Sequence, residues 1–418
     1  MCIRDRNNVK DKHMKKIALI LAFLSTASIA ISQEKSDKNI ASFELGSGLN
    51  FSFNEGNYQF NLGGFIQPAY NYSKVDGYDS ENEFNSKSAF LIISGKAINE
   101  KVSFLIQTDY SRSEPLLDAW IAYHPSEKST ITIGQKQTFV NNREMMYRED
   151  RLQFTDRSIL SHNFSDTGRE FGVFFESKYG TNFGISPMVA VTSGDGRNSF
   201  GSDSRDTDIG GLKIGGRLDL YPLGYFSSGN DLFTADLAHE KTLKFVLGGA
   251  ISKNTGASNS SGEGHGDFLL YNTNGEERLP DYSQLYLDLL VKYSGFSLLL
   301  EYVNASADNL DLLYTNEAAS TILVPGQISN FLILGDSYNI QTGYVTNNGL
   351  SFDIRFESST PEFNSNSSSV LKDANSYTFG LTKYFDNNNL KMQASYSKLD
   401  LENGNNQSFG EFLIQVIF

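Results

Sequence analysis

The sequence lacks any hydrophobic run long enough to cross a membrane as a helix, and its one apolar stretch, near the N-terminus, is short. A transmembrane helix needs about 20 consecutive apolar residues. The hydrophobic fraction is 39% and the mean hydropathy is −0.33, which excludes a helical membrane protein. A transmembrane β-barrel is still allowed, because half of each strand faces water and its spans do not raise the average hydropathy.

Cysteine and tryptophan are almost absent, with one residue of each. The lone Cys2 excludes a disulfide framework. Basic residues are outnumbered 35 to 49, and the net charge of −14 argues against nucleic acid as a partner, because phosphates would be repelled. Phenylalanine and tyrosine, by contrast, are abundant at 31 and 21 residues, as expected of the aromatic girdles of a barrel.

The N-terminal region predicts export. Residues 1–13 do not resemble a targeting signal, and we interpret them as sequence upstream of the natural start of translation. Residues 14–32 then have a basic start, an apolar core at 17–24, and the small residues Ala30 and Ser32 before a cleavage point, which is the pattern of a signal peptide. The alternative, a single anchoring helix, is disfavoured because Ser25 soon interrupts the apolar core.

The C-terminal residues 408–418 alternate between two faces and end in an aromatic side chain. The apolar face consists of Phe412, Ile414, Val416 and Phe418. The polar face contains Glu411 and Gln415. A last strand with an apolar outer face that ends in Phe is typical of outer-membrane β-barrels. A soluble protein rarely leaves such a strand exposed at its edge. The ending therefore predicts an outer-membrane location.

Alternating segments recur along the chain, for example at 116–124, 284–293 and 351–357, with charged residues opposite an aliphatic row. This pattern indicates a wet interior and an apolar exterior. A soluble β-sandwich would show the same alternation with the aliphatic face buried, but the C-terminal Phe418 and the signal peptide favour a barrel. The sequence predicts an all-β fold, a transmembrane up-and-down antiparallel β-barrel of about 16 strands.

Tight turns and long polar connections alternate between the predicted strands, as in barrels with short periplasmic turns and long outer loops. Long connections are predicted at 74–83, 139–167, 194–207, 256–283, 307–330 and 359–375. One connection, 223–240, falls on the short-turn side and is nevertheless long. The predicted organisation is an upstream segment 1–13, a signal peptide 14–32, a short periplasmic segment 33–57 and the barrel 58–418.

The chain contains Asp-Ala-Trp-Ile-Ala-Tyr at 118–123 and Thr-Ile-Gly-Gln-Lys at 132–136, followed by a long polar segment and an Arg-x-x-Gly strand start at Arg169. In these motifs the chain resembles the phosphate-selective porin O and P family. The family usually has a proline shortly after the Gly-Gln element, where this chain has Gln-Thr-Phe-Val at 137–140. The resemblance implies a trimeric, sixteen-stranded passive channel for small hydrophilic solutes, with a preference for anions such as phosphate.

The third outer loop, 139–167, is the candidate constriction. Residues 142–152 are good helix formers without Gly or Pro, so a short helix folded into the lumen is expected. Candidate anion-binding residues on and beside this loop are Arg143, Arg148, Arg151, Arg157 and the strand residue Lys136. Acidic residues outnumber the arginines of the loop, so a purely structural network of ion pairs is the alternative.

The predicted lumen face also carries charges of both signs. Candidate lumen-lining residues are Asp118, Lys213, Arg217, Asp288, Lys292 and Arg355. Opposed charges order water and admit polar solutes in a general porin, so they do not by themselves predict phosphate selectivity.

Catalytic, metal and cofactor sites are not expected. The histidines accompany no Gly-x-Ser-x-Gly elbow and no metal motif, so a barrel hydrolase is disfavoured. A plugged structural or adhesive barrel is the other alternative. Expected partners are outer-membrane lipid and lipopolysaccharide, small polar or anionic solutes, and two further copies in a homotrimer. The acidic loops 74–83 and 194–208 fit no calcium loop, so a solvated surface is favoured over cation bridging to lipopolysaccharide.

Overall fold

The computed structural model describes residues 39–197, 211–402 and 404–418. The predicted upstream segment and signal peptide lie outside these residues, as does most of the acidic loop 194–208. None of the helices in the described ranges is long and apolar enough to cross a membrane.

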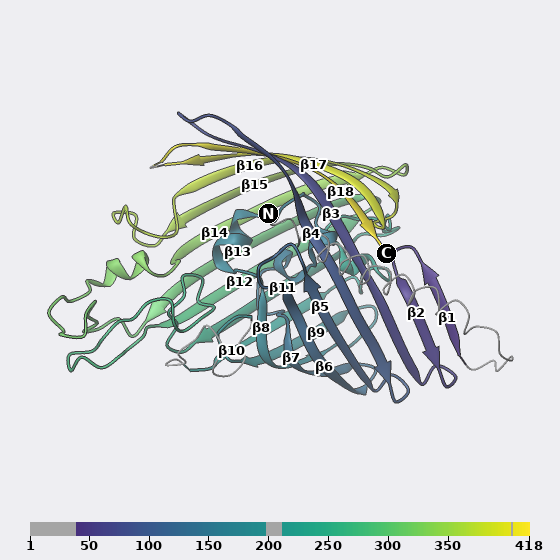
Figure 1. The fold of residues 1–418 in the computed structure, drawn as a ribbon, viewed down its shortest axis with the longest axis horizontal. Helices are drawn as coiled ribbons and strands as arrows, with labels where there is room; N and C mark the ends of the chain where they lie inside the picture. The colour runs from purple at the N-terminus through teal and green to yellow at the C-terminus, as the bar shows by residue number, and fades with distance from the viewer. Residues whose placement is uncertain (1–38, 198–210, 403) are drawn as a thin grey trace, which may run out of the picture.

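Eighteen strands form one antiparallel sheet, shown in Figure 1. The first nine are β1 (Ile40–Glu44), β2 (Gly48–Phe53), β3 (Tyr58–Val75), β4 (Glu81–Ala97), β5 (Val102–Asp109), β6 (Leu116–Ser126), β7 (Ser129–Gln137), β8 (Arg169–Ser177) and β9 (Gly184–Thr192). The others are β10 (Lys213–Tyr221), β11 (Lys244–Asn254), β12 (Asp281–Tyr293), β13 (Phe296–Asp308), β14 (Gly335–Val345), β15 (Leu350–Pro361), β16 (Ala374–Asp386), β17 (Leu390–Leu401) and β18 (Gln407–Ile417).

The sixteen strands from β3 to β18 close into a barrel. Each pairs with its neighbour in sequence, and β18 returns to β3, with Gln407 opposite Val75 and Ile417 opposite Phe65. The predicted sixteen-stranded up-and-down barrel, closed by the last strand against the first, is confirmed.

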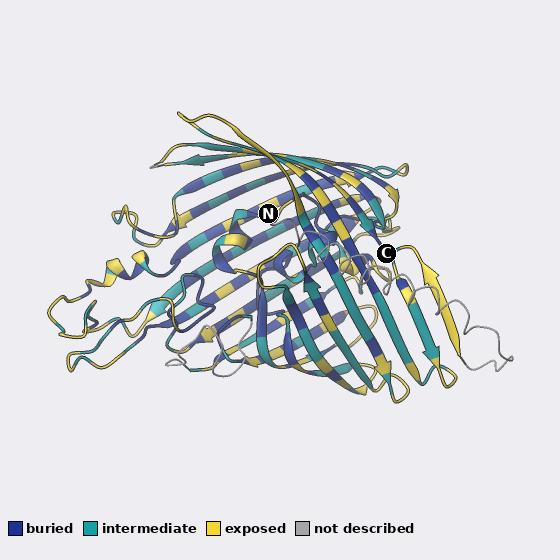
Figure 2. Ribbon diagram, viewed as in Figure 1, coloured by how far each residue is buried: buried dark blue, intermediate teal, exposed yellow. Residues whose placement is uncertain are grey.

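The outward faces of the strands are apolar and the inward faces are largely polar. On β18, Phe412 and Phe418 are 40% and 38% exposed, whereas the inward Gln415 is fully buried. On β6, Ile121 faces out and Asp118 is buried inside. Figure 2 shows this alternation as bands of exposed and buried residues along the strands. Apolar side chains thus face the lipid and polar side chains face the lumen. The predicted orientation of alternate residues is confirmed in both strands.

Two strands that were not predicted from the sequence, β1 and β2, precede the barrel. β2 pairs with the first residues of β3, from Tyr58 to Leu62, where β18 has already ended, and β1 pairs with β2. The turn between them touches the end of β18, since the Gly46 amide donates to the Ile417 carbonyl at 3.1 Å. Gly46 has φ +90°, and a Cβ there would lie 2.0 Å from Asn389 Oδ1, so this close approach requires glycine. The hairpin therefore extends the barrel wall at its short-turn end (Figure 1).

The connections differ from the prediction in one place. β3 ends only at Val75 and β4 already begins at Glu81, because residues on both sides of the predicted loop 74–83 pair in the sheet. The connection is therefore short. The connection 222–243 between β10 and β11 is long and lies at the short-turn end, as predicted. Short turns of outer-membrane barrels face the periplasm, and we use that orientation below.

Candidate functional site in the barrel lumen

The connection between β7 and β8, residues 138–168, folds into the lumen and is called loop 3 below. It contains the 3-10 helices η1 (Glu144–Met146) and η2 (Glu149–Arg151) and the short α-helix α2 (Ile159–Phe164). The helix expected over 142–152 is thus absent, and the short helix lies later in the loop. The backbone of Arg148 between the two 3-10 helices is extended (φ −71°, ψ 154°).

Arg143 is buried in a four-member ion network. Its guanidinium donates to Asp288 of β12 at 2.5 Å and to Asp219 of β10 at 2.8 Å. Arg217 donates to the same two carboxylates at 2.5 and 2.8 Å. Two arginines thus face two aspartates, and the network is neutral. It fixes the start of loop 3 to the wall formed by β10 and β12.

Glu144 is the second anchor of the loop. Its carboxylate accepts hydrogen bonds from the Ser158 amide and hydroxyl, and from the Ser161 hydroxyl. These bonds tie η1 to the start of α2. Arg355 of β15 lies 3.4 Å from Glu144 and also pairs with Glu357 at 3.1 Å. The ion pairs of this group thus join two carboxylates, Glu144 and Glu357, to the single guanidinium of Arg355.

Arg157 and Glu149 belong to a third buried group. Arg157 donates to the carbonyls of Glu144 and Tyr147 at 2.8 and 2.7 Å, and lies 3.4 Å from Glu149. Glu149 also accepts from Arg169, which in turn lies 3.5 Å from Asp118 on β6. Burial alone would raise the pKa of Glu149, but the charges of Arg169 and Arg157 lower it overall, so the carboxylate stays ionised.

Arg148 and Arg151 form a different kind of group. The Arg148 guanidinium donates two hydrogen bonds of 2.5 and 2.9 Å to the Asp150 carboxylate, and the Arg151 guanidinium lies 3.9 Å from the same carboxylate. The Lys391 ammonium also comes close, donating to the Asp150 carbonyl at 2.9 Å. Two arginines therefore share the Asp150 carboxylate, and the Lys391 ammonium binds the backbone carbonyl of the same residue. The side chains of Arg148 and Arg151 keep 20% and 25% of their surface exposed, so this net positive group faces open space.

This positive group lies toward the periplasmic turns. The Asp150 carbonyl accepts from Asn388 in the turn between β16 and β17. The Arg151 guanidinium lies 5.9 Å from the Phe233 ring in the connection 222–243. The Arg148 guanidinium lies 5.4 Å from the ring of Phe65, which pairs with the penultimate residue of the chain.

Two further predicted cations are paired with wall carboxylates. Lys136 lies 2.9 Å from Glu176 and close to the rings of Phe139 and Phe174. Lys213 is buried and lies 2.8 Å from Glu170. Both face the half of the lumen that loop 3 fills with apolar side chains.

A cavity of about 820 Å³ opens on the outer side of loop 3, and we call it the outer vestibule. Its charged lining consists of Glu81, Glu83, Lys87, Asp156, Arg157, His162, Arg355, Glu357 and Glu411. Lys87 pairs with Glu411 at 2.7 Å and with Asp156 at 3.7 Å. Burial would lower the pKa of His162, but the hydrogen bond and charge of Asp156 raise it overall. With His162 neutral, acidic side chains exceed basic ones here.

A second cavity, of about 520 Å³, lies on the inner face of β1 to β6 at the periplasmic end and is called the inner vestibule. Between the two vestibules the wall is packed. Phe65, Phe90 and Leu117 form a cluster that is almost fully buried, and Gln67 donates to Gln415 at 2.7 Å. Arg148 lies over Phe65 at this level. Arg148 therefore lies against a packed part of the wall on β3.

The connection 222–243 closes part of the periplasmic end and is called the periplasmic plug. Its 3-10 helix η4 (Asn230–Leu232) lies beside Lys292 of β12. The fully buried Lys292 ammonium donates to the carbonyls of Asn230, Phe233 and Ala235 at 2.5, 2.7 and 2.9 Å. The lumen-facing lysine predicted from the sequence thus holds a folded segment in place.

Several residues of the site were missed by sequence reasoning. Arg169 was noted only as part of a motif, and Lys87, Glu149, Asp150 and Lys391 were not selected. Strand alternation places Lys391 on the lumen face, so that signal was available. Lys87 lies at a β-bulge of β4, where simple alternation fails. The charged partners of the two carboxylates lie within 20 residues, but their pairing follows no periodic pattern, and Lys391 is 241 residues from Asp150. No group of His, Cys, Asp and Glu in the described ranges could hold a metal ion.

No protein-family model and no curated protein matches this sequence, so the resemblance to the phosphate-selective porin O and P family stays a prediction. Solved structures match the fold. The outer membrane channel DcaP of Acinetobacter baumannii has a TM-score of 0.55 at 11% identity, over 87% of this chain and 98% of that one. A loop L8 deletion mutant of OmpT, an outer membrane protein of Vibrio cholerae, has a TM-score of 0.52 at 11% identity, over 87% of this chain and all of that one. The chain therefore has the fold of outer-membrane β-barrels.

Proposed function

We propose that the protein is a passive diffusion channel for small hydrophilic solutes in the outer membrane, and that loop 3 sets its narrowest layer. Support comes from the two vestibules, which lie at opposite ends of the lumen and share the wall formed by β3 and β4. Both contain several polar side chains, which replace part of the hydration of a polar solute. Transport follows the solute gradient, so the proposal requires no cofactor.

We also propose a modest anion preference that depends on Arg148 and Arg151. Their group is the observation that carries it, because two arginines share the single Asp150 carboxylate, the Lys391 ammonium lies on the Asp150 carbonyl, and both arginines are partly exposed. Arg143 and Arg157, by contrast, are buried and compensated by carboxylates or carbonyls, so their role in this proposal is to hold loop 3 in place. Phosphate is one solute that such a group would favour.

Replacing both Arg148 and Arg151 with glutamine should shift ion selectivity toward cations. A unit charge at ~4 Å contributes about 1 kcal/mol even in water, so we expect the chloride-to-potassium permeability ratio to fall about fivefold. The reversal potential of single channels in a planar bilayer under a KCl gradient measures this. The matched control is Lys253→Gln with Lys398→Gln, which removes two exposed cations outside both vestibules. An unchanged ratio in the arginine variant would exclude the anion proposal.

One observation favours a second function, a plugged structural barrel without transport. The layer formed by Phe65, Phe90 and Leu117 is packed, and Arg148 covers it. If this layer never opens, no current is expected from any variant with loop 3 in place.

The homotrimer and the contact with lipopolysaccharide are proposals as well, and they rest on the resemblance alone.

A further inference from the structure

We propose that the inner vestibule is a binding site for a neutral saccharide. The proposal deepens the channel function, since it names a solute class for the same lumen, but binding itself does not require that the channel conducts. It depends on the chemistry of the surface that the β1–β2 hairpin adds to the barrel wall.

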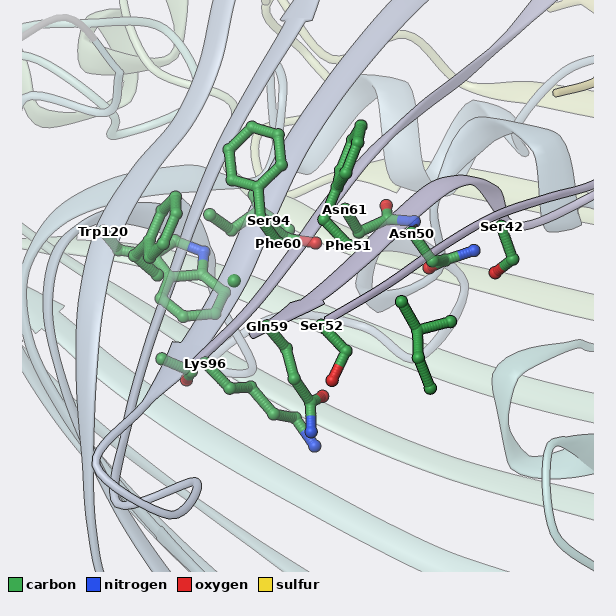
Figure 3. Close-up of a pocket in the computed structure, with 15 residues that line it drawn as sticks. Ser42, Asn50, Phe51, Ser52, Gln59, Phe60, Asn61, Ser94, Lys96 and Trp120 are labelled. Atoms are coloured by element: carbon green, nitrogen blue, oxygen red, sulfur yellow. Dashed lines mark hydrogen bonds between the residues drawn. The ribbon is translucent and has the colours of Figure 1, made fainter. Parts of the chain in front are cut away.

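The hairpin builds one wall of the vestibule. Its inward residues include Ser42, Asn50 and Ser52, which continue the polar face of β3 to β5. Asn50 lies opposite Asn61 in the sheet, and Asn61 Nδ2 donates to Asn50 Oδ1 at 2.8 Å. Figure 3 shows Gln59, Ser52 and Lys96 on one face of these strands, and Phe51 and Phe60 on the other. Without the hairpin, β3 would present an unpaired edge here and the cavity would be open.

The polar side chains of the lining carry almost no charge, and Ile40, Leu105 and four aromatic residues add apolar surface. Its polar side chains are Ser42, Asn50, Ser52, Gln59, Asn61, Ser94, Lys96 and Ser103. The one charged group, Lys96, is paired with Glu100 at 2.9 Å. The outer vestibule, in contrast, is lined by nine charged or titratable side chains. An ionic solute therefore gains little from the inner vestibule, whereas a neutral solute rich in hydroxyls finds many hydrogen-bonding partners.

The only tryptophan of the chain, Trp120, lines the same cavity. The apolar C–H face of a pyranose ring packs on an indole, while its hydroxyls bond to the amides and hydroxyls around it. The amides are held in position, since Asn61 is bound to Asn50 and Gln59 Nε2 donates to the Gly56 carbonyl at 3.3 Å. Fixed amides lose less conformational freedom when they bind a ligand.

The cavity is also of suitable size. Its volume of about 520 Å³ falls within the range of about 300–1,000 Å³ of small-molecule sites, which accommodates a mono- to trisaccharide. Two sources share this chemistry: solute sugars that enter from outside, and glycan fragments of the periplasm.

Trp120 reports directly on the site, because no other tryptophan contributes to the fluorescence of the protein. We expect the emission of the detergent-solubilised protein to change saturably on titration with maltotriose or with the N-acetylglucosamine trimer, in the millimolar range. The stronger of the two responses identifies the source. Sorbitol, which has hydroxyls but no ring face, and inorganic phosphate should each give no saturable change. A response to phosphate equal to that of both sugars, or no response to either sugar, would overturn the proposal.

Asn61→Leu should weaken sugar binding about tenfold, as expected when a hydrogen bond worth about 1.4 kcal/mol is lost. Ser94→Ala serves as a second variant if Asn61→Leu does not fold, with a smaller loss in the same direction. Ser376→Ala, which removes a hydroxyl from the outer vestibule, is the matched control and should bind as the parent does. Equal affinities in all three variants would contradict the assignment. Normal channel currents with no sugar binding would reject the saccharide site and leave the proposed channel intact.

Discussion

Replacing Arg143 with alanine is expected to lower the free energy of unfolding by about 3–5 kcal/mol, the usual cost of removing one partner from a buried ion pair. The change leaves Asp219 and Asp288 with Arg217 as their one remaining partner in the network. The uncompensated carboxylate is buried between loop 3 and the wall, so water cannot solvate it. Urea unfolding of the protein in lipid vesicles, followed by Trp120 fluorescence, measures the loss.

Lys398→Ala is the matched control for this experiment. Lys398 also pairs with an aspartate, Asp400 at 2.7 Å, but both side chains are exposed. Exposed pairs contribute about 0–1 kcal/mol, so the control should unfold almost as the parent does. If Arg143→Ala and Lys398→Ala had equal small effects, the buried network would not be what holds loop 3.

Lys292→Met is expected to release the periplasmic plug from the lumen. The methionine keeps the apolar stem but leaves three buried carbonyls without their donor. Each unsatisfied buried group costs about 1–3 kcal/mol, so the open form of the plug should become at least tenfold more populated. Chymotrypsin added from the periplasmic side should then cut at Phe226 or Phe233 at least tenfold faster.

Lys244→Met is the control, because Lys244 lies at the base of the same connection but is only half-buried and donates to one carbonyl, that of Leu223. It should leave the cleavage rate near that of the parent. A cleavage rate in Lys292→Met no higher than in Lys244→Met would show that other contacts hold the plug, among them the hydrogen bonds from Asn230 to Asp236 and Glu240.

The barrel could be predicted from the sequence because its pattern is local. Alternation along a strand fixes which side chains face lipid, and Phe412 and Gln415 lie on the predicted sides. The long connection on the short-turn side was also visible in the sequence, since Pro222 and Lys241 bound a stretch without strand alternation. The β1–β2 hairpin was missed because five- and six-residue strands give too few alternations to stand out.

The interior of the lumen could not be predicted in the same way. Helix propensity favoured a helix over 142–152, but Arg143 and Glu144 bond to partners that lie up to 211 residues away along the chain. Such contacts outweigh local propensity and leave two 3-10 turns in its place. Sequence reasoning likewise named four loop arginines, but only the three-dimensional pairing separates Arg148 and Arg151, which reach open space, from Arg143 and Arg157, which do not.

The most direct test of the channel proposal is the current carried by the purified, full-length barrel in a planar lipid bilayer. The proposal predicts discrete, ohmic conductance steps in KCl without any added ligand or energy source. Addition of Arg143→Ala protein, in which loop 3 is loosened, should give larger or noisier steps. If the parent protein gave no steps while Arg143→Ala conducted, the barrel would be plugged by loop 3 and passive diffusion would be contradicted.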